Sequence, residues 1–423
     1  MRQLRALMLR VPGRRLVGQS AAYMAINILA AFGPLALIPF LTRVLTPESY
    51  GIYGNFLAGM GVATVVLGLN MDLVVRRHGR EAGPKLRPWV NAALWVTAGM
   101  AVMAVAFALL FGTRMPAVVN ALGVPLTYIP LMLLCGALMV VHNIASLVAT
   151  MRQSVKVYGL IRLGSVALFV LLAFGMYLGW RQVVGDVLLA RLISLGAAAL
   201  VGLWWLRRFE AFGVRTLSDT TVARVKTGLM YGVPLVPAVF FDPMMSFVNR
   251  VVLTHYESLN AAGQYALAYQ LAQPLQLMGS SVSIALFPHM VGWFDEHTPV
   301  ARRKLMLTAV ATLMLMLAVW TVYALAALPL LLPFLGGEAY TRAAPLVAPL
   351  AMSFVIGGLA TVLASRYFHN GQTWWISVCC LLGLGLNLLL CLLNPTLQGT
   401  TTGLLAGSMM TCMWLGLGLL PRR

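Results

Sequence analysis

Charged residues are scarce in this sequence, and acidic ones are the scarcest. Only 10% of the 423 residues are charged, with 11 Asp or Glu against 30 Lys or Arg. A soluble protein of this length needs a charged surface that so few residues cannot supply. Hydrophobic residues make up 60% of the chain, and apolar runs of about 20 residues, enough to cross a bilayer, recur along it. The composition predicts an all-α, polytopic membrane protein.

Several kinds of chemical site are missing as well. No His, Asp and Glu set has metal spacing, no serine lies in a nucleophile-elbow sequence, and no glycine-rich stretch has the lysine of a phosphate loop. The five cysteines lie in apolar runs without zinc or disulfide spacing: Cys135, Cys379, Cys380, Cys391 and Cys412. We therefore expect a protein that is not an enzyme and that has no catalytic residue, metal or cofactor.

Twelve apolar runs have the length of a membrane span. They cover residues 17–42, 50–74, 89–112, 124–150, 157–179, 183–206, 229–253, 261–291, 304–328, 340–364, 373–393 and 399–420. We interpret the first as a retained span, because no small-residue cleavage site follows the N-terminal arginines. The longest polar segment, 207–228, is predicted to be a cytoplasmic linker between six-helix bundles formed by residues 1–206 and 229–423.

The basic residues alternate between the connections. Counted from the N-terminus, alternate connections hold 23 Lys or Arg and the intervening ones hold 5. By the positive-inside bias, both termini lie in the cytoplasm and the two halves have the same orientation. The net charge of +19 therefore reflects topology, and no nucleic-acid partner is expected.

Residues 43–54, Arg-Val-Leu-Thr-Pro-Glu-Ser-Tyr-Gly-Ile-Tyr-Gly, join the first two spans. Thr46, Pro47 and Glu48 predict a helix start, with Thr at the N-cap, Pro at N1 and an acid in the first turn. Tyr50 and Tyr53 are expected at a membrane interface, where an apolar ring with a polar tip is favourable. An ordinary tight loop between two spans is the alternative interpretation.

A partial echo of this stretch begins 207 residues later. Arg250, Thr254, Glu257-Ser258 and Gly263-Gln-Tyr265 repeat the order Arg, Thr, Glu-Ser and Gly-x-Tyr. Because the two stretches occupy equivalent places in the two halves, we interpret them as paired outer hairpins.

Ionisable residues inside spans cost about 2.5–3.5 kcal/mol each on insertion scales, so each needs a partner or a function. Asp242 lies near the middle of the seventh span, and Ser246 and Asn249 follow at i+4 and i+7 on the same helix face. Three prolines interrupt this span and free backbone carbonyls. The pattern predicts an ion-coupling site, and an ion pair between Asp242 and an arginine of a neighbouring helix stays open.

Arg162 and Arg191 lie inside the fifth and sixth spans. Arginine keeps its charge, so each needs an acid, carbonyls or an anionic ligand, and a cationic cavity would attract a phosphate-bearing substrate. Snorkelling to the cytoplasmic interface is the alternative for Arg162. Polar stripes that include Asn27, Gln273 and Gln276 predict either a water-filled central cavity or a packed interface.

The two outer stretches resemble those of a known family. Residues 43–54 resemble the first hairpin of bacterial polysaccharide (O-antigen and exopolysaccharide) flippases, which belong to the multidrug/oligosaccharidyl-lipid/polysaccharide exporter superfamily. Residues 249–288 resemble the matching segment of the second half. That segment often has Asp where this chain has Asn249, which weakens the transfer of an ion-pair role to this position.

The resemblance implies two six-helix bundles that form a V around a central cavity in the bacterial inner membrane. It implies that a lipid-pyrophosphate-linked oligosaccharide moves from the cytoplasmic to the outer leaflet by alternating access. Candidate partners are this substrate, membrane lipids, H+ or Na+, and other polysaccharide-assembly membrane proteins. The predicted substrate-binding residues are Arg191, Arg162, Arg250, Asn27, Gln273 and Gln276. The predicted outer gate is formed by Arg43, Tyr50 and Tyr53.

Two other functions stay open. A multidrug cation antiporter of the same superfamily would need an acidic cavity, and this chain has few acids inside its spans. A membrane glycosyl polymerase or ligase would need a sizeable outer loop, and the predicted outer connections are short.

Overall fold

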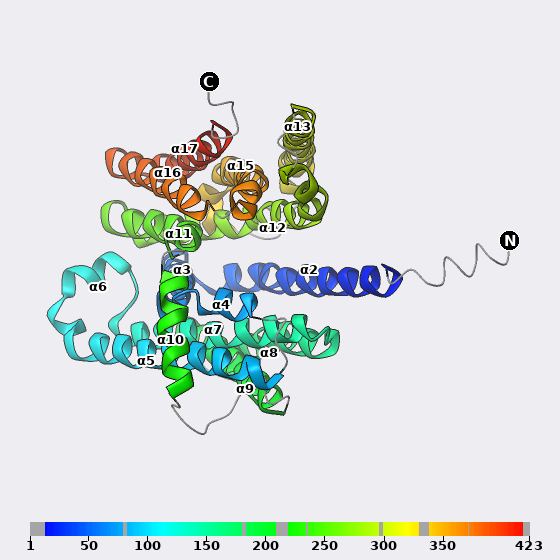
Figure 1. Cartoon of the computed structure of the whole chain (residues 1–423). Helices are drawn as coiled ribbons and strands as arrows, with labels where there is room; N and C mark the ends of the chain where they lie inside the picture. Colours follow the sequence, from blue (N-terminus) through cyan, green and yellow to red (C-terminus); the bar gives the residue numbers. More distant parts are fainter. Residues whose placement is uncertain are drawn as a thin grey trace.

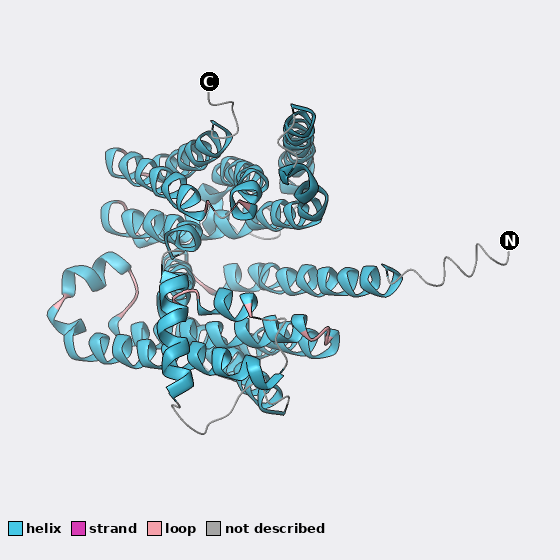
Figure 2. Cartoon of the chain, in the orientation of Figure 1, coloured by secondary structure: helices cyan, strands magenta, loops and turns pink. Residues whose placement is uncertain are grey.

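The computed structural model describes residues 13–78, 83–179, 183–208, 219–233, 236–295, 299–329, 338–370 and 372–417, and these are helical with short turns between (Figure 2). The twelve longest helices each overlap one predicted span. They are α2 (Gly13–Val44), α3 (Pro47–Gly68), α5 (Gly83–Phe111), α7 (Ile129–Met151), α8 (Val155–Gly179), α9 (Val183–Arg208), α11 (Val236–Tyr256), α12 (Leu259–Asp295), α13 (Pro299–Val322), α15 (Ala344–His369), α16 (Thr373–Leu393) and α17 (Leu397–Leu417). The predicted all-α class is confirmed.

Within the described ranges, 9 helical stretches are long and apolar enough to cross a membrane. The remaining long helices, α11, α12 and α17, carry more polar residues, such as the glutamines of α12 and the threonines at the start of α17. Their assignment as spans therefore depends on their place in the bundle, because polar stripes lower hydropathy even in a helix that is packed inside a membrane protein.

The long helices form two bundles (Figure 1). We call α2–α9 the N-terminal half and α11–α17 the C-terminal half. In the first, α7 packs on α3 and α9, and α8 packs on α2 and α9; in the second, α15 packs on α12 and α17, and α16 packs on α11 and α17. Helix α3 contacts α11 and α12 of the other half, and the largest hydrophobic core includes residues of both halves. The predicted two-bundle architecture is confirmed.

Three short helices complete the part of the fold that positions the site. They are α4 (Met71–Arg77), α6 (Pro116–Leu122) and α10 (Asp219–Gly232). The predicted span 50–74 is divided, because Leu69 and Asn70 take left-handed conformations, with φ of 43° and 55°, and end α3 before α4 begins. Such a backbone is unfavourable for residues other than glycine and ends a helix. Helix α4 therefore lies beyond the end of the apolar span, which is Pro47–Gly68.

Helix α10 contains much of the predicted linker, whose residues 209–218 lie outside the described ranges. It lies across α5 (Figure 1) and contacts α4 and α5. The Arg224 guanidinium lies 4.6 Å from the Trp89 ring centroid, and Asn70 Nδ2 donates to the Gly232 carbonyl at 3.3 Å. The segment that leads into the C-terminal half is thus packed on the N-terminal half.

Candidate functional site

The two stretches that echo each other in sequence pack against each other in the structure. Thr46 caps α3 as predicted: its Oγ1 accepts from the Ser49 amide at 3.2 Å, and Pro47 is at N1. The start of α3 crosses the start of α12 so closely that a Cβ atom at Gly51 would collide with the Leu259 carbonyl oxygen. A residue without a side chain is needed where two backbones approach in this way.

Polar side chains join the halves at this crossing. Tyr50 OH donates to Gln270 Oε1 at 2.7 Å, and Arg250 Nη1 donates to the Gly54 carbonyl at 2.6 Å. The Arg250 guanidinium also lies 5.1 Å from the Tyr269 ring centroid. Arg250 is only 3% exposed, so in this conformation it serves the contact between the halves, and its predicted role in substrate binding stays a prediction.

Two further bonds extend this contact. Asn55 Nδ2 donates to Thr254 Oγ1 at 2.9 Å, and Tyr340 OH donates to the Leu45 carbonyl at 2.9 Å. We call the four cross-half bonds, those made by Tyr50, Arg250, Asn55 and Tyr340, the latch. It lies at the end of the molecule that the basic-residue distribution places outside.

The predicted outer-gate residues lie in different environments. Tyr50 and Tyr53 are 0% and 3% exposed, so the prediction that they lie at a membrane interface is wrong. Their rings pack edge to face, 5.7 Å between centroids, and lie buried in the contact between the halves. Arg43 is exposed at the end of α2 and has no hydrogen bond or ion pair with a described residue.

The predicted ion-coupling face is only partly described, since the Asp242 side chain lies outside the described residues. Ser246 is buried, with 6% exposure, and Asn249 is completely buried. In the described part of the chain, no group of three or more His, Cys, Asp or Glu side chains could hold a metal ion.

The Asn249 amide is at the centre of a neutral network inside the C-terminal half. Its Nδ2 donates to Tyr265 OH at 2.9 Å and to the Thr400 carbonyl at 3.3 Å. Its Oδ1 accepts from Asn387 Nδ2 at 2.8 Å and from Cys391 Sγ at 3.3 Å. An amide offers two donors and one oxygen with two lone pairs, so Asn249 is fully occupied by protein partners from α12, α16 and α17.

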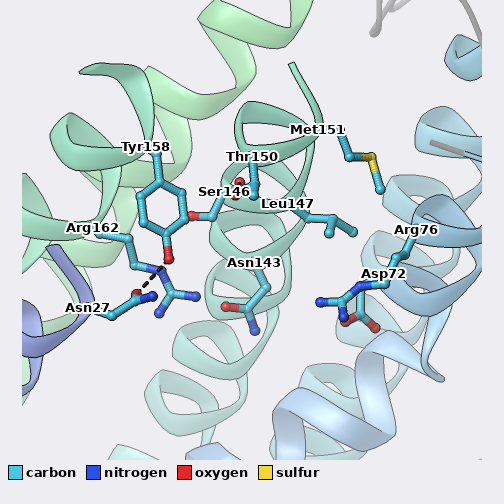
Figure 3. Close-up of a pocket in the computed structure, with 10 residues that line it drawn as sticks. All are labelled: Asn27, Asp72, Arg76, Asn143, Ser146, Leu147, Thr150, Met151, Tyr158 and Arg162. Carbon is cyan, nitrogen blue, oxygen red and sulfur yellow. Dashed lines mark hydrogen bonds between the residues drawn. The ribbon is translucent and has the colours of Figure 1, made fainter. Parts of the chain in front are cut away.

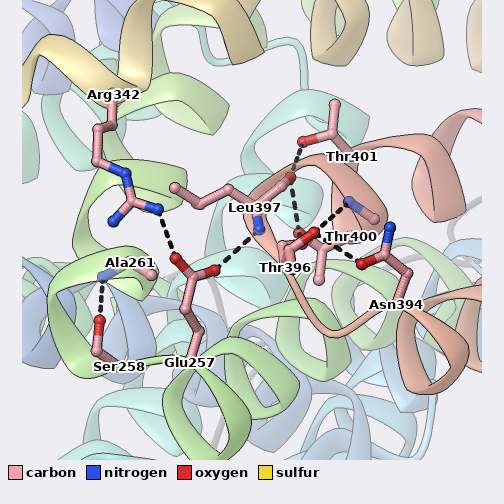
Figure 4. Close-up of polar contacts among 10 residues, drawn as sticks. Glu257, Ser258, Ala261, Arg342, Asn394, Thr396, Leu397, Thr400 and Thr401 are labelled. Atoms are coloured by element: carbon pink, nitrogen blue, oxygen red, sulfur yellow. Dashed lines mark hydrogen bonds and ion pairs between the residues drawn. The ribbon is translucent and has the colours of Figure 1, made fainter.

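Glu257 makes a second set of contacts in this half (Figure 4). Its Oε1 lies 2.5 Å from Arg342 Nη2, and its Oε2 accepts from the Leu397 amide at 3.0 Å. It thereby ties the α11–α12 turn to the short helix η5 (Glu338–Ala343) and to the start of α17. The sequence echo included Glu257, but nothing in the sequence indicated these partners.

A polar pocket of about 770 Å³ lies in the N-terminal half (Figure 3). Helices α2, α4, α7 and α8 line it, near the end that the basic-residue distribution places in the cytoplasm. Its lining residues are Asn27, Asp72, Arg76, Asn143, Ser146, Leu147, Thr150, Met151, Tyr158 and Arg162.

One side of the pocket joins two residues that the sequence predicted to bind substrate. Tyr158 OH donates to Asn27 Oδ1 at 2.6 Å, and the Arg162 guanidinium carbon lies 5.8 Å from the Tyr158 ring centroid. Arg162 Nε is buried without a hydrogen-bond partner in the described part of the chain. Since an arginine needs a partner for its fork of donors, this side of the pocket suits an anion.

The α4 side of the pocket was not predicted. Asp72 and Arg76 stand one turn apart on α4, across the pocket from Arg162 (Figure 3). Burial raises the pKa of Asp72 above its usual range, because it disfavours the charged carboxylate. The pocket is thus lined by two guanidinium groups and one carboxyl group.

The other predicted substrate-binding residues lie outside this pocket. The Arg191 guanidinium lies 5.2 Å from the Phe169 ring centroid, and its Nε has no partner among the described residues. Gln273 is exposed on α12 and Gln276 is partly exposed there. The structure therefore brings Asn27 and Arg162 together and leaves Arg191, Gln273 and Gln276 apart from them.

The bundle of long apolar helices around a polar, cation-bearing pocket is the architecture of a multi-pass membrane protein. The model of the polysaccharide biosynthesis protein family matches residues 16–293. This chain belongs to that family.

A curated relative has a more specific description. The chain is 27% identical over 355 residues to the succinoglycan biosynthesis transport protein ExoT of Rhizobium meliloti (strain 1021). The match covers 80% of this chain and 66% of that relative, so the chain spans just under two thirds of the length of that relative.

Solved transporters share the fold at low sequence identity. An inward-facing multidrug resistance MATE family transporter of the MOP superfamily matches with a TM-score of 0.69 and 14% identity over 94% of each chain. The MATE multidrug transporter DinF-BH matches with a TM-score of 0.69 and 16% identity, over 97% of this chain and 95% of that one. These likenesses establish the fold alone.

Proposed function

We propose that this protein carries a polyprenyl-pyrophosphate-linked oligosaccharide across the cytoplasmic membrane by alternating access, as a step in polysaccharide biosynthesis. The proposal rests on two features that lie at opposite ends of the molecule. A latch holds the halves together at the predicted outer end, and a cation-bearing pocket lies at the predicted cytoplasmic end. Membership of the polysaccharide biosynthesis protein family and the relative named as a transport protein support this choice of substrate.

The chemistry of the pocket favours an anionic cargo. Arg76 and Arg162 face a single acid, Asp72, and a guanidinium binds phosphate oxygens through paired, charge-assisted hydrogen bonds. A multidrug cation antiporter, the alternative from the same superfamily, would need the opposite balance of charge. The solved multidrug transporters share the fold, which does not determine the cargo.

In the proposed cycle, the conformation described here would receive the headgroup from the cytoplasm. Opening to the outside would break the four latch bonds, and the cytoplasmic ends of the halves would approach each other. We infer no catalysis in this cycle. Asp242, within α11, stays the candidate for coupling to H+ or Na+, and the proposed topology keeps both termini in the cytoplasm of a bacterium.

The proposal is tested with the purified full chain in vesicles that contain a fluorescently labelled polyprenyl-diphosphate oligosaccharide. Quenching from outside measures which leaflet holds the label. We expect the label to move between leaflets in vesicles with the protein, and to stay in place in vesicles without it. If the label stays in its starting leaflet with and without H+ and Na+ gradients, the flippase proposal is wrong.

A further inference from the structure

One face of α7 forms an uncharged wall of the pocket. Asn143, Ser146, Leu147, Thr150 and Met151 line the pocket at positions i, i+3, i+4, i+7 and i+8, the spacing of one helix face. The arginines stand on other helices, α4 and α8. In Figure 3 the α7 residues lie between Arg76 on one side and Arg162 on the other.

This wall has hydrogen-bonding groups that have no partner among the residues the structure describes. Ser146 is 2% exposed, and its Oγ has no partner in the part of the chain that the structure describes. The Asn143 amide likewise bonds to no described residue. Thr150 Oγ1 donates to the Ser146 carbonyl at 2.9 Å and keeps its own lone pairs as acceptors. Of these three residues only Ser146 is buried, and a buried polar group without a partner is costly, so a water or a ligand has to satisfy its Oγ.

The mixture of side chains indicates the kind of ligand. Amide and hydroxyl groups alternate with the apolar side chains of Leu147 and Met151 on the same face. A sugar ring has the matching surface, with hydroxyl groups around its rim and C–H groups on its faces. The wall has no cationic group to neutralise a phosphate, and the cationic residues that line the pocket stand on α4 and α8.

The size of the pocket leads to the same conclusion. A volume of about 770 Å³ is within the range of sites that enclose a drug-sized molecule, roughly 300–1,000 Å³. A diphosphate alone would occupy a small part of this volume, whereas a diphosphate with an attached sugar would fill more of it.

We propose that the α7 wall recognises the sugar attached directly to the diphosphate, through hydrogen bonds from Asn143, Ser146 and Thr150, while Arg162 binds the diphosphate. This inference depends on the proposed function, since it assumes a lipid-linked saccharide. It makes these α7 residues determinants of specificity: a sugar that lacks a matching hydroxyl would leave the buried Ser146 Oγ unpaired, and such a loss discriminates strongly.

The test compares two lipids that differ by one sugar. Undecaprenyl diphosphate, and the same lipid with a single hexose (glucose and galactose in separate runs), are titrated against the full chain in nanodiscs. We expect at least one hexosyl lipid to bind roughly tenfold more tightly than the bare lipid, as one or two added hydrogen bonds would give. In the double variant Asn143→Leu with Ser146→Ala, this advantage should disappear while the affinity for bare undecaprenyl diphosphate stays unchanged.

Two control variants complete the test. Arg162→Gln should weaken binding of both lipids, whereas Thr361→Ala, at an exposed position of α15, should change neither. Ser146→Ala alone, which removes one oxygen atom, serves if the double variant does not fold.

Three results would contradict the inference. If both lipids bind the unaltered protein equally well, or if the α7 variants weaken both lipids alike or neither of them, the α7 wall does not recognise sugar, although the flippase proposal stands. If neither lipid binds the unaltered protein, the proposed function itself is wrong.

Discussion

The polar clusters around Asn249 and Glu257 in the C-terminal half differ from the pocket of the N-terminal half in how their buried polar groups are satisfied. In the C-terminal half, Asn249 uses every hydrogen-bonding position of its amide on protein partners, and Glu257 binds both Arg342 and the Leu397 amide. In the N-terminal half, Ser146 Oγ and Arg162 Nε are buried without a partner among the described residues. A fully satisfied network makes a structure rigid, whereas unsatisfied groups in a pocket are available to a ligand.

The arginines beside these clusters also differ in whether they have a partner within the protein. Arg250 and Arg342 of the C-terminal half are engaged by Gly54 and Glu257, while Arg162 of the N-terminal half faces the pocket. From this comparison we propose that the N-terminal half holds the anionic headgroup, and that the C-terminal half acts as a rigid body that docks onto it through the latch. Three experiments test this division of roles.

The largest effect is expected from locking the latch. Asn55 and Thr254 lie on opposite halves with 2.9 Å between their bonded atoms. In a variant with the native cysteines replaced by alanine, Asn55→Cys and Thr254→Cys would be joined by oxidation or by a short thiosulfonate cross-linker. We expect transport in vesicles to fall to background and to recover on reduction, because alternating access requires the halves to separate at this end.

The matched control is a link within one half. Glu257→Cys and Arg342→Cys replace the two residues of an ion pair inside the C-terminal half. If this half moves as one body, the link should leave transport unchanged. Loss of transport with the Glu257–Arg342 link, or full transport with the Asn55–Thr254 link, would contradict the proposed division of roles.

A smaller effect is expected from removing the unpartnered cation. Arg162→Gln should weaken binding of undecaprenyl diphosphate about ten- to hundredfold, since a hydrogen bond to a charged group contributes roughly 1.5–3 kcal/mol. Arg43→Gln is the control, because it removes the same charge at an exposed position. Titration in nanodiscs measures the affinity of each variant for the lipid. If the two affinities are equal, Arg162 does not bind the diphosphate, and snorkelling to the cytoplasmic interface explains its position.

The fold was predictable from the sequence because its signals are local. Span lengths follow from hydropathy, and the start of α3 follows from Thr46 and Pro47, whose capping depends only on neighbouring residues. The burial of Tyr50 was not predictable, because an aromatic ring with a polar tip suits a membrane interface and a packed interface alike. Residues far away in the sequence decide between them: Gln270, 220 positions away, accepts from Tyr50 OH, and the Tyr340 ring packs on the Tyr50 ring.

The candidate site was predictable only in part, and the reason is geometric. Asn27 and Arg162 were identified because polar residues inside spans need an explanation. Arg76 looked like one of the many basic residues that set the membrane topology. No sequence pattern shows that α3 ends at Gly68, or that residues of α4 face α7 across the pocket. Helical periodicity placed Asn249 on the face of Asp242, but it carried no information about the partners that α16 and α17 supply.

The smallest effect is expected from a change in pH. It tests whether the affinity of the N-terminal pocket depends on the charge of Asp72. Burial raises the pKa of Asp72, so on acidification this carboxyl becomes neutral at a higher pH than an exposed aspartate does. Its loss of negative charge leaves Arg76 and Arg162 uncompensated. Affinity for hexosyl undecaprenyl diphosphate should therefore rise about two- to fivefold as the pH falls from about 7.5 towards about 4, the usual range for an aspartate, as expected for one partly screened charge.

The Asp72→Asn variant shows whether the pH dependence comes from the Asp72 carboxyl or from another titrating group. The lipid-linked sugar diphosphate is a diester with no proton to gain in this pH range, so the pH dependence has to come from the protein. The variant should bind at pH 7.5 as tightly as the unaltered protein does at low pH, and its affinity should then be constant with pH. A variant that keeps the full pH dependence would show that another group titrates, and the first one to replace would be Asp242 on α11. Coupling would then lie in the half that the Asn249 network makes rigid.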